Sequence, residues 1–226
     1  MERMMQTKRY ARSEMVYTEL KNQIINLGLQ MGEPLAEESL SERFKVSRTP
    51  IREALFQLEK DGFVQSMPRK GFWVRVLSVA DIEEIYLIRE ALEGISAGRA
   101  ATLLDQHNIE YLEERWLVAE ALVSDGDRGQ ALEVSNSLHE TILRVGGNNR
   151  VVQIINNLRE NIQRLHIIAA MLPGRLEQSS IEHHAILLAL KQRDPVLAEQ
   201  AMRKHIASTS LEVILKYRNE PLPMAE

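Results

Sequence analysis

Three histidines fall on three different predicted helices in the C-terminal part of the chain: His139, His183 and His205. An imidazole nitrogen is a strong ligand for divalent transition metals, and helix bundles commonly assemble such ligands from facing helices. The chain contains no cysteine, so histidines and carboxylates are the only strong ligands it offers. Because a histidine on a helix is more often a structural residue than a ligand, the hypothesis requires a fold that brings all three together.

A second group of polar side chains opens a predicted helix over residues 48–60. Arg48, Thr49 and Arg52 lie in its first turn, where guanidinium groups can bind guanine O6 and N7, or a phosphate beside free backbone N–H groups. The alternative is that Arg48 and Arg52 are merely solvated neighbours four residues apart. Like charges at this spacing slightly destabilise a helix when no polyanion is nearby, which favours the DNA-binding interpretation. Arg69, Lys70 and Gly71 form a second basic stretch, between two predicted strands.

The charge distribution agrees with a DNA-binding N-terminal part. The chain carries a net charge of -4, but residues 1–76 hold 13 Lys and Arg against 10 Asp and Glu, a net +3, which leaves -7 for the remainder. Such asymmetry indicates a polyanion-binding head on a body with another task. No stretch approaches the ~18 apolar residues that span a bilayer, and no signal segment is recognisable. We therefore expect a cytoplasmic protein without membrane contact.

Helical and strand periodicities in residues 1–76 predict a winged helix-turn-helix domain. In this arrangement the second helix of a tightly connected pair enters the major groove and a hairpin contacts a flanking groove or the backbone. Ser47 is the expected N-cap of that second helix, through its side-chain hydroxyl. The predicted helices cover 13–27, 37–44 and 48–60, and the strands cover 63–66 and 72–76.

Residues 77–226 show helical periodicity without a strand signal, which predicts an all-α bundle and a mainly α fold class for the chain. Ser78 is the expected N-cap of the first of these helices, and Asp194 followed by Pro195 is typical of the start of the last. The predicted helices cover 79–104, 109–124, 129–145, 150–171, 181–193 and 195–217.

Several stretches of the N-terminal part together resemble the DNA-binding domain of GntR-type bacterial regulators. They are LAE at 35–37, VSRTPIREAL at 46–55, GFV at 62–64 and RKGF at 69–72. The resemblance implies that Arg48, Thr49 and Arg52 contact bases and phosphates, and that Lys70 and Gly71 enter a groove. Glu38 departs from members that place an arginine there, which removes one expected DNA contact.

The acidic part resembles the FCD effector-binding domain found in the FadR branch of these regulators. The matching stretches are SLH at 137–139, IEHHAI at 181–186, Asp194 and MRKHI at 202–206. In metal-binding members, three histidines and an Asp or Asn four residues before the first hold a divalent ion. That position is Ser135 here, and Asn136 lies roughly 100° away around the helix. The missing carboxylate leaves both an occupied and an empty metal site open, because three imidazoles, water and an effector carboxylate could still hold zinc or nickel. His184 is excluded by register.

The resemblance also implies a small organic acid as effector. Arg89, with Arg159 or Arg164, could bind its carboxylate bidentately, although each is equally compatible with a surface ion pair. His166 is expected to line the same cavity.

The predicted function is a homodimeric, ligand-responsive transcription regulator rather than an enzyme, in which the acid relieves repression at a double-stranded DNA operator. Two alternatives remain at this stage. One is a constitutive DNA-binding protein whose helical domain only dimerises. The other is a metal-dependent hydrolase, which would need a general base, whereas Glu140 and Glu182 are expected to point away from the histidines.

Overall fold

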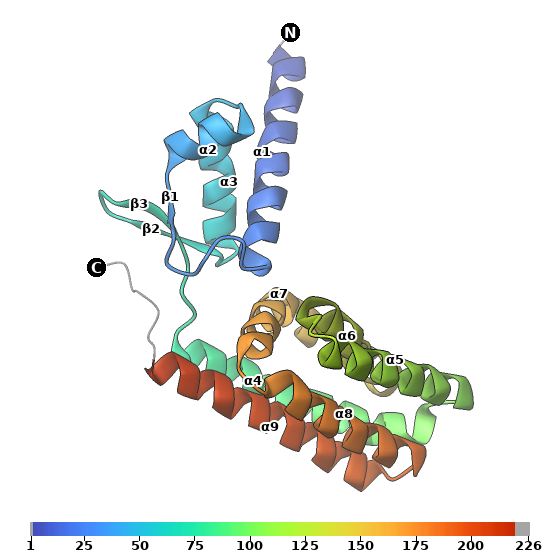
Figure 1. Ribbon diagram of the computed structural model, residues 1–226. Coiled ribbons are helices and arrows are strands. Elements are labelled where there is room, and N and C mark those ends of the chain that lie inside the picture. The colour runs from blue at the N-terminus through green and yellow to red at the C-terminus, as the bar shows by residue number, and fades with distance from the viewer. Residues whose placement is uncertain (1, 220–226) are drawn as a thin grey trace. The chain divides into compact units, whose positions relative to one another are not determined.

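The computed structural model describes residues 2–219, which divide into two compact units (Figure 1). One unit comprises the described residues up to Leu77 and the other comprises Ser78–Asn219. Among the described helices, none combines the length and the apolar character needed to cross a membrane.

The first unit has the winged helix-turn-helix architecture predicted from the sequence, with three helices and a small antiparallel sheet in the order β1-β3-β2 (Figure 1). In the sheet, Leu35 and Ser66 both lie opposite Phe72 on the central strand. The elements are α1 (Glu2–Ile25), β1 (Pro34–Leu35), α2 (Glu37–Phe44), α3 (Arg48–Lys60), β2 (Val64–Met67) and β3 (Gly71–Val74).

The core of this unit fixes which face of α3 meets solvent. Val16, Leu20 and Ile24 recur on one face of α1 and are fully buried, as are Ile51 and Leu55 of α3. Packing these two apolar faces together leaves the opposite face of α3 outside, because residues three and four apart share a face of a helix.

Four details of this unit differ from prediction. Helix α1 extends from Glu2 to Ile25 rather than over 13–27, because Leu27 takes a positive φ and ends it. The short strand β1 was missed, since two residues show no period. Strands β2 and β3 begin and end one or two residues away from the predicted bounds. Ser47 occupies the N-cap of α3, but its hydroxyl makes no capping hydrogen bond.

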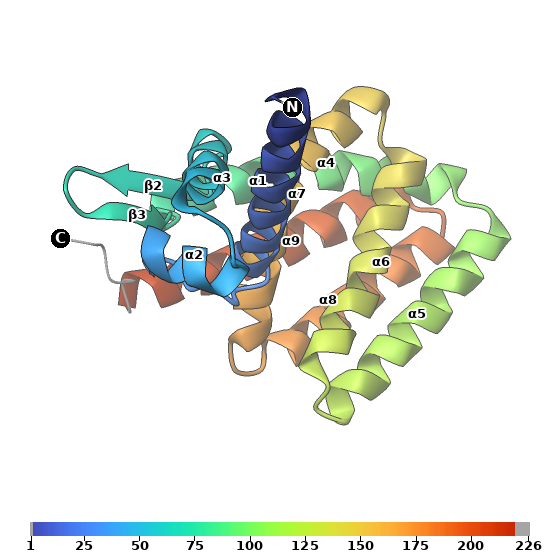
Figure 2. The same cartoon turned by 90° about the horizontal axis from the view of Figure 1, so that it is seen from above.

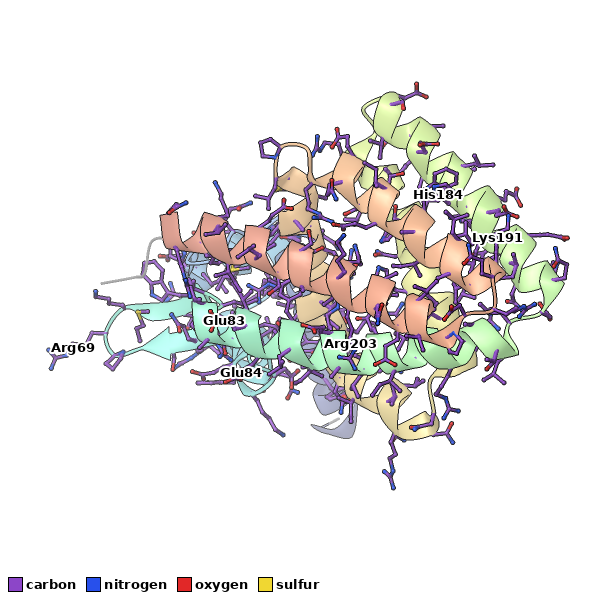
Figure 3. All side chains as sticks on the ribbon, turned by 90° about the horizontal axis from the view of Figure 1, so that it is seen from below. Arg69, Glu83, Glu84, His184, Lys191 and Arg203 are labelled. Carbon is purple, nitrogen blue, oxygen red and sulfur yellow. The ribbon has the colours of Figure 1, made fainter. Side chains whose placement is uncertain are left out.

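The second unit is all-α, as predicted (Figure 2). Helices α4 and α9 lie side by side along much of their length (Figures 1 and 3). The elements are α4 (Val79–Leu103), α5 (Gln106–Ser124), α6 (Arg128–Gly146), α7 (Asn149–Met171), α8 (Arg175–Lys191) and α9 (Pro195–Asn219).

Side-chain caps define the helix starts in this unit. Ser78 and Asp81 form a capping box at α4, and Asp194 Oδ1 accepts hydrogen bonds from the backbone N–H groups of Val196 and Leu197 at α9. Helix α8 instead begins at Arg175, six residues before its predicted start at 181. Its first turns are polar and lack an apolar period, so tertiary contacts, rather than amphipathicity, stabilise them.

Glycines let α6 and α9 approach α4 closely. A Cβ added at Gly146 of α6 would lie 1.9 Å from the backbone oxygen of Ser96, and one at Gly94 of α4 would lie 2.7 Å from Cγ of Arg203. Arg203 extends from α9 towards α4 (Figure 3). A side chain at Gly146 would collide with the backbone of α4 and force α6 away from it, whereas a side chain at Gly94 would require Arg203 to move. Gly146 thus sets the spacing between α4 and α6.

Candidate functional site

The fold brings His139 of α6, His183 of α8 and His205 of α9 together in the interior of the helical unit. Nε2 of His183 lies 3.3 Å from Nε2 of His139 and 3.2 Å from Nε2 of His205. All three side chains are buried, and their ligand atoms lie within 4.8 Å of one another. The three imidazoles therefore direct their nitrogens to one point.

Two of the three rings are held by buried carboxylates, each of which also binds an arginine. Nδ1 of His139 donates to Glu93 Oε2 at 2.6 Å, and Arg89 Nε donates to the other oxygen of Glu93 at 2.7 Å. The same order recurs on the opposite side, where Nδ1 of His205 donates to Glu182 Oε2 at 2.8 Å and Arg175 binds the same glutamate.

These carboxylates determine the tautomers of the two rings. A carboxylate accepts hydrogen bonds only, so Nδ1 of His139 and of His205 carries the proton and Nε2 presents its lone pair to the centre. Burial would raise the pKa of Glu93, but the nearby Arg89 and His139 outweigh it and hold that pKa well below its usual range. Glu93 is thus a permanent anion of the core.

Burial, followed by the positive charge of neighbouring groups, lowers the pKa of His183 and His205 well below the ordinary value of 6.5. Burial likewise lowers the pKa of His166, whose ring centroid lies 6.0 Å from that of His139. At neutral pH these rings are therefore uncharged, which is the form that binds a metal ion.

This geometry fits a divalent transition metal. A tetrahedral ion with metal–nitrogen bonds of about 2.0–2.1 Å separates its ligand nitrogens by about 3.3–3.4 Å. The two measured Nε2 separations, 3.3 and 3.2 Å, agree with that spacing. Ser135 lines the surrounding chamber of about 40 Å³, so a hydroxyl stands at the position predicted to lack a carboxylate.

A larger cavity of about 470 Å³ adjoins this chamber between α4, α6 and α7. Arg89, Asn136, His139 and His166 line both spaces, so the two lie on either side of these residues. The remaining residues that line the larger cavity combine polar and apolar side chains: Glu93, Glu140, Leu143, Arg144, Val152, Ile155, Asn156, Arg159, Ile162 and Gln163.

The structure separates the three arginines that the sequence offered as effector contacts. Arg89 is buried and lines the cavity, so it is not a surface residue. Arg159 lines the outer part of the cavity but forms an exposed ion pair with Glu140 at 3.1 Å. Arg164 is fully buried and lies outside the residues that line this cavity, so the structure does not bring it to the predicted site.

The expectation that Glu182 points away from the histidines was wrong, since Glu182 accepts the Nδ1 proton of His205. Sequence reasoning also missed Arg175, the first residue of α8, whose guanidinium contacts both Glu182 and Glu212. Among the arginine–glutamate pairs that support the histidines, only Arg89 and Glu93 are visible in the sequence, because they lie four residues apart on one helix. His184 lies outside the cluster, stacked on Trp116 at 4.2 Å between ring centroids, on the α5 side of α8 (Figure 3).

The predicted DNA-reading residues form an exposed surface in the first unit. Arg48, Thr49 and Arg52 lie on the outer face of α3. Arg69 and Lys70 in the β2–β3 turn and Gly71 at the start of β3 are exposed, and Arg69 points away from the hairpin (Figure 3). Arg69 and Gly71 both have positive φ angles, which shape this turn. At Gly71 this conformation causes no strain, because glycine has no Cβ.

A winged helix-turn-helix unit with exposed arginines at the start of α3, followed by a helical unit, is the architecture of a DNA-binding transcription regulator. The model of the bacterial regulatory proteins of the gntR family matches residues 12–74, and the FCD domain model matches residues 84–208. The chain therefore belongs to the GntR family of bacterial transcription regulators and carries an FCD domain.

Known relatives agree with this assignment. The chain is 27% identical to the HTH-type transcriptional repressor RspR of Escherichia coli K12, over 92% of this chain and 91% of the relative. It is 30% identical to a probable D-xylose utilization operon transcriptional repressor of Paenarthrobacter nicotinovorans, over 80% and 79% of the two chains. A GntR regulator structure from Rhodococcus sp. RHA1 shares the fold, with a TM-score of 0.73 at 20% identity, covering 92% of this chain and all of that one.

The depressed pKa values of His183 and His205 predict that the metal-free protein loses stability in mild acid. The unfolded chain takes up protons on these residues below about pH 6.5, whereas the folded chain does not until lower pH. The contribution of these two uncharged histidines to the free energy of unfolding is therefore complete above about pH 6.5 and is lost as the pH falls. We expect the melting temperature in EDTA to decrease from pH 7.5 to 5.5.

The double variant His183→Gln and His205→Gln should flatten this dependence, whereas the exposed His107→Gln should retain it. A melting temperature that stays constant or rises towards pH 5.5 in the unmodified protein would contradict the assignment.

Proposed function

We propose that this protein is a repressor whose FCD domain binds a small carboxylate effector beside a metal centre, and that effector binding releases the operator. The observation that carries the proposal is that Arg89, Asn136, His139 and His166 line both the 470 Å³ cavity and the chamber that contains the histidine cluster. This volume lies within the range typical of small-molecule sites. The names of the two relatives given above support repression rather than activation.

His139, His183 and His205 would hold the ion, and zinc or nickel best matches three imidazoles. When bound, such an ion supplies a Lewis acid that accepts an effector carboxylate. Arg89 lines both spaces, so the N–H groups of its guanidinium that do not bind Glu93 could donate to the same carboxylate. Ser135 brings no charge, so an anionic effector would complete both the coordination and the charge balance of the site.

Ligand sensing explains the site better than hydrolysis does. Glu93 and Glu182, the carboxylates that contact the histidines, are each occupied by an Nδ1 proton and an arginine. Neither is available as a general base for water. A purely structural dimerisation domain would also have no need for this cluster, because burying charged groups is costly and well-packed apolar residues stabilise at least as well.

We propose that the protein acts as a homodimer in the cytoplasm, where its operator lies. Helices α4 and α9 expose large apolar side chains, among them Leu87, Ile95, Leu211 and Leu215. An exposed apolar surface of this kind favours association with a second copy. Pairing doubles the DNA contacts and sets the spacing of the two half-sites.

The proposed contacts with double-stranded DNA come from α3 and the hairpin. Arg48, Thr49 and Arg52 would read base edges and adjacent phosphates in the major groove. Arg69, Lys70 and Gly71 would contact the flanking groove or backbone. Exposure of all six residues supports this division of roles.

DNA binding can be measured on a duplex selected from a random pool with the unmodified protein, here called the selected duplex. Arg48→Ala and Arg52→Ala should each weaken its binding by about 1–3 kcal/mol if the arginine binds a base bidentately. Lys70→Ala should weaken all sequences alike and flatten the salt dependence by about one unit. Folded arginine variants with unchanged affinity would exclude α3 as the reading helix.

The metal proposal predicts that zinc raises the melting temperature of the unmodified protein by binding only the folded state. Ser135→Asp should increase that shift, because it adds a carboxylate one helical turn before His139. A variant with all three histidines replaced by alanine should show no shift. Equal zinc content in this variant and the unmodified protein, measured by elemental analysis, would place the metal elsewhere.

Effector binding in the FCD domain should couple to DNA binding. We expect a panel of mono-, di- and tricarboxylic acids, titrated by calorimetry into zinc-loaded protein, to contain an acid that binds less tightly once the selected duplex is bound. Linkage requires that this acid weaken DNA binding by the same factor, typically about 5- to 150-fold. An acid that binds the free and DNA-bound protein equally would not be the effector, and a panel without any coupled acid would contradict the sensing role.

A further inference from the structure

Both arginines proposed to read DNA are paired with acidic residues of the preceding helix. Nη2 of Arg48 donates to Oε1 of Glu38 at 2.7 Å, and Nε of Arg52 lies 3.3 Å from Oε1 of Glu37. The first pair is the more exposed, with side-chain exposures of 62% for Arg48 and 73% for Glu38. The DNA-reading surface therefore contains its own competitor for the arginine.

We propose that Glu38 is a specificity-determining residue, whose carboxylate occupies Arg48 in the free protein and favours operator DNA over unrelated DNA. The inference rests on the proposed contact of Arg48 with DNA. It does not depend on the metal centre or on the effector.

On unrelated DNA, Arg48 can gain little. Its contribution there is the electrostatic attraction of one cation to a phosphate, accompanied by release of a counterion. The neighbouring Glu38 already neutralises that cation, and its own negative charge is repelled by the phosphates. Pairing within the protein therefore cancels most of the benefit of the arginine.

On the correct sequence, the exchange is favourable. Guanine presents O6 and N7 as two acceptors that match the guanidinium fork, so a bidentate base contact replaces the single contact with Glu38. Because exposed ion pairs are weak, the bidentate guanine contact can displace Glu38 from Arg48. A single phosphate contact is little stronger than the pair with Glu38 that it would replace. Glu38 thus lowers binding to unrelated DNA more than binding to the operator.

Glu38 suits this role better than Glu37. The Glu37 side chain is only 29% exposed, and its oxygen lies farther from its arginine. Glu42 lies one turn further along α2 and is also exposed, and the described part of the chain shows no ion pair for it. It therefore provides a matched control for the loss of one negative charge from the same helix.

The test compares Glu38→Gln with Glu42→Gln in the full-length protein, using the selected duplex and a scrambled duplex of equal composition. Glu38→Gln should tighten binding to the scrambled duplex about 3- to 10-fold and steepen its salt dependence by about one unit, as expected for one additional phosphate contact. Binding to the selected duplex should tighten less than twofold, so the specificity ratio falls. Glu42→Gln should change both affinities by less than twofold.

A double-mutant cycle tests whether Arg48 carries the effect. In an Arg48→Ala background, Glu38→Gln should no longer tighten binding to the scrambled duplex. Persistence of the gain would show general charge repulsion and overturn the proposal. Weaker binding of Glu38→Gln to the selected duplex, or an unchanged specificity ratio, would also overturn it. An Arg48→Ala variant that binds the selected duplex normally would instead refute the underlying DNA contact.

Discussion

The helical domain depends on the mutual neutralisation of charges that its core buries. Arg89 and Glu93 of α4 are almost inaccessible to solvent, as are Arg175 and Glu182 of α8. An isolated charge in such a place is very costly, and removing one partner of a buried pair typically costs about 3–5 kcal/mol. The two pairs therefore constrain the packing of the helices that bear them, and through His139 and His205 they extend this constraint to α6 and α9.

This balance explains the chemistry proposed for the site. Arg89 and Arg175 are paired with Glu93 and Glu182, and the pKa values of His183 and His205 are too low for these two rings to add charge at neutral pH. A divalent ion would therefore bring positive charge that the adjoining protein groups do not offset, since Ser135 stands where a carboxylate would. An anionic effector in the adjoining cavity would offset it. An effector bound in the cavity would thereby change the charge balance of contacts between α4, α6, α8 and α9. Binding could alter the packing of the helical domain in this way.

In the DNA-binding unit, by contrast, the ion pairs of Arg48 and Arg52 are exposed to solvent. Its arginines are paired on the surface, where water and salt screen the interaction and a pair is worth little. Such pairs exchange partners readily, as an encounter with DNA requires. The apolar faces of α1 and α3 provide the rigid support, whereas Arg48 and Glu38 remain at the surface and free to rearrange. The rigid core thus holds α3 in place, while its weakly paired arginines can exchange Glu37 and Glu38 for DNA.

The sequence by itself predicted the architecture of both units and the three histidines that the fold brings together. Local signals suffice for the bounds of α3, which has a clear apolar face, and of α9, which begins at the Asp194 cap. They also suffice to place each of the three histidines on a helix. Tertiary structure decided what local patterns do not encode. The early start of α8, the contacts of Glu182 and Arg175, and the exclusion of Arg164 from the cavity all depend on residues distant in sequence. The physical reason is that a polar side chain carries no periodic signal: whether it is buried and paired or exposed to solvent is set by the partner that another helix brings to it.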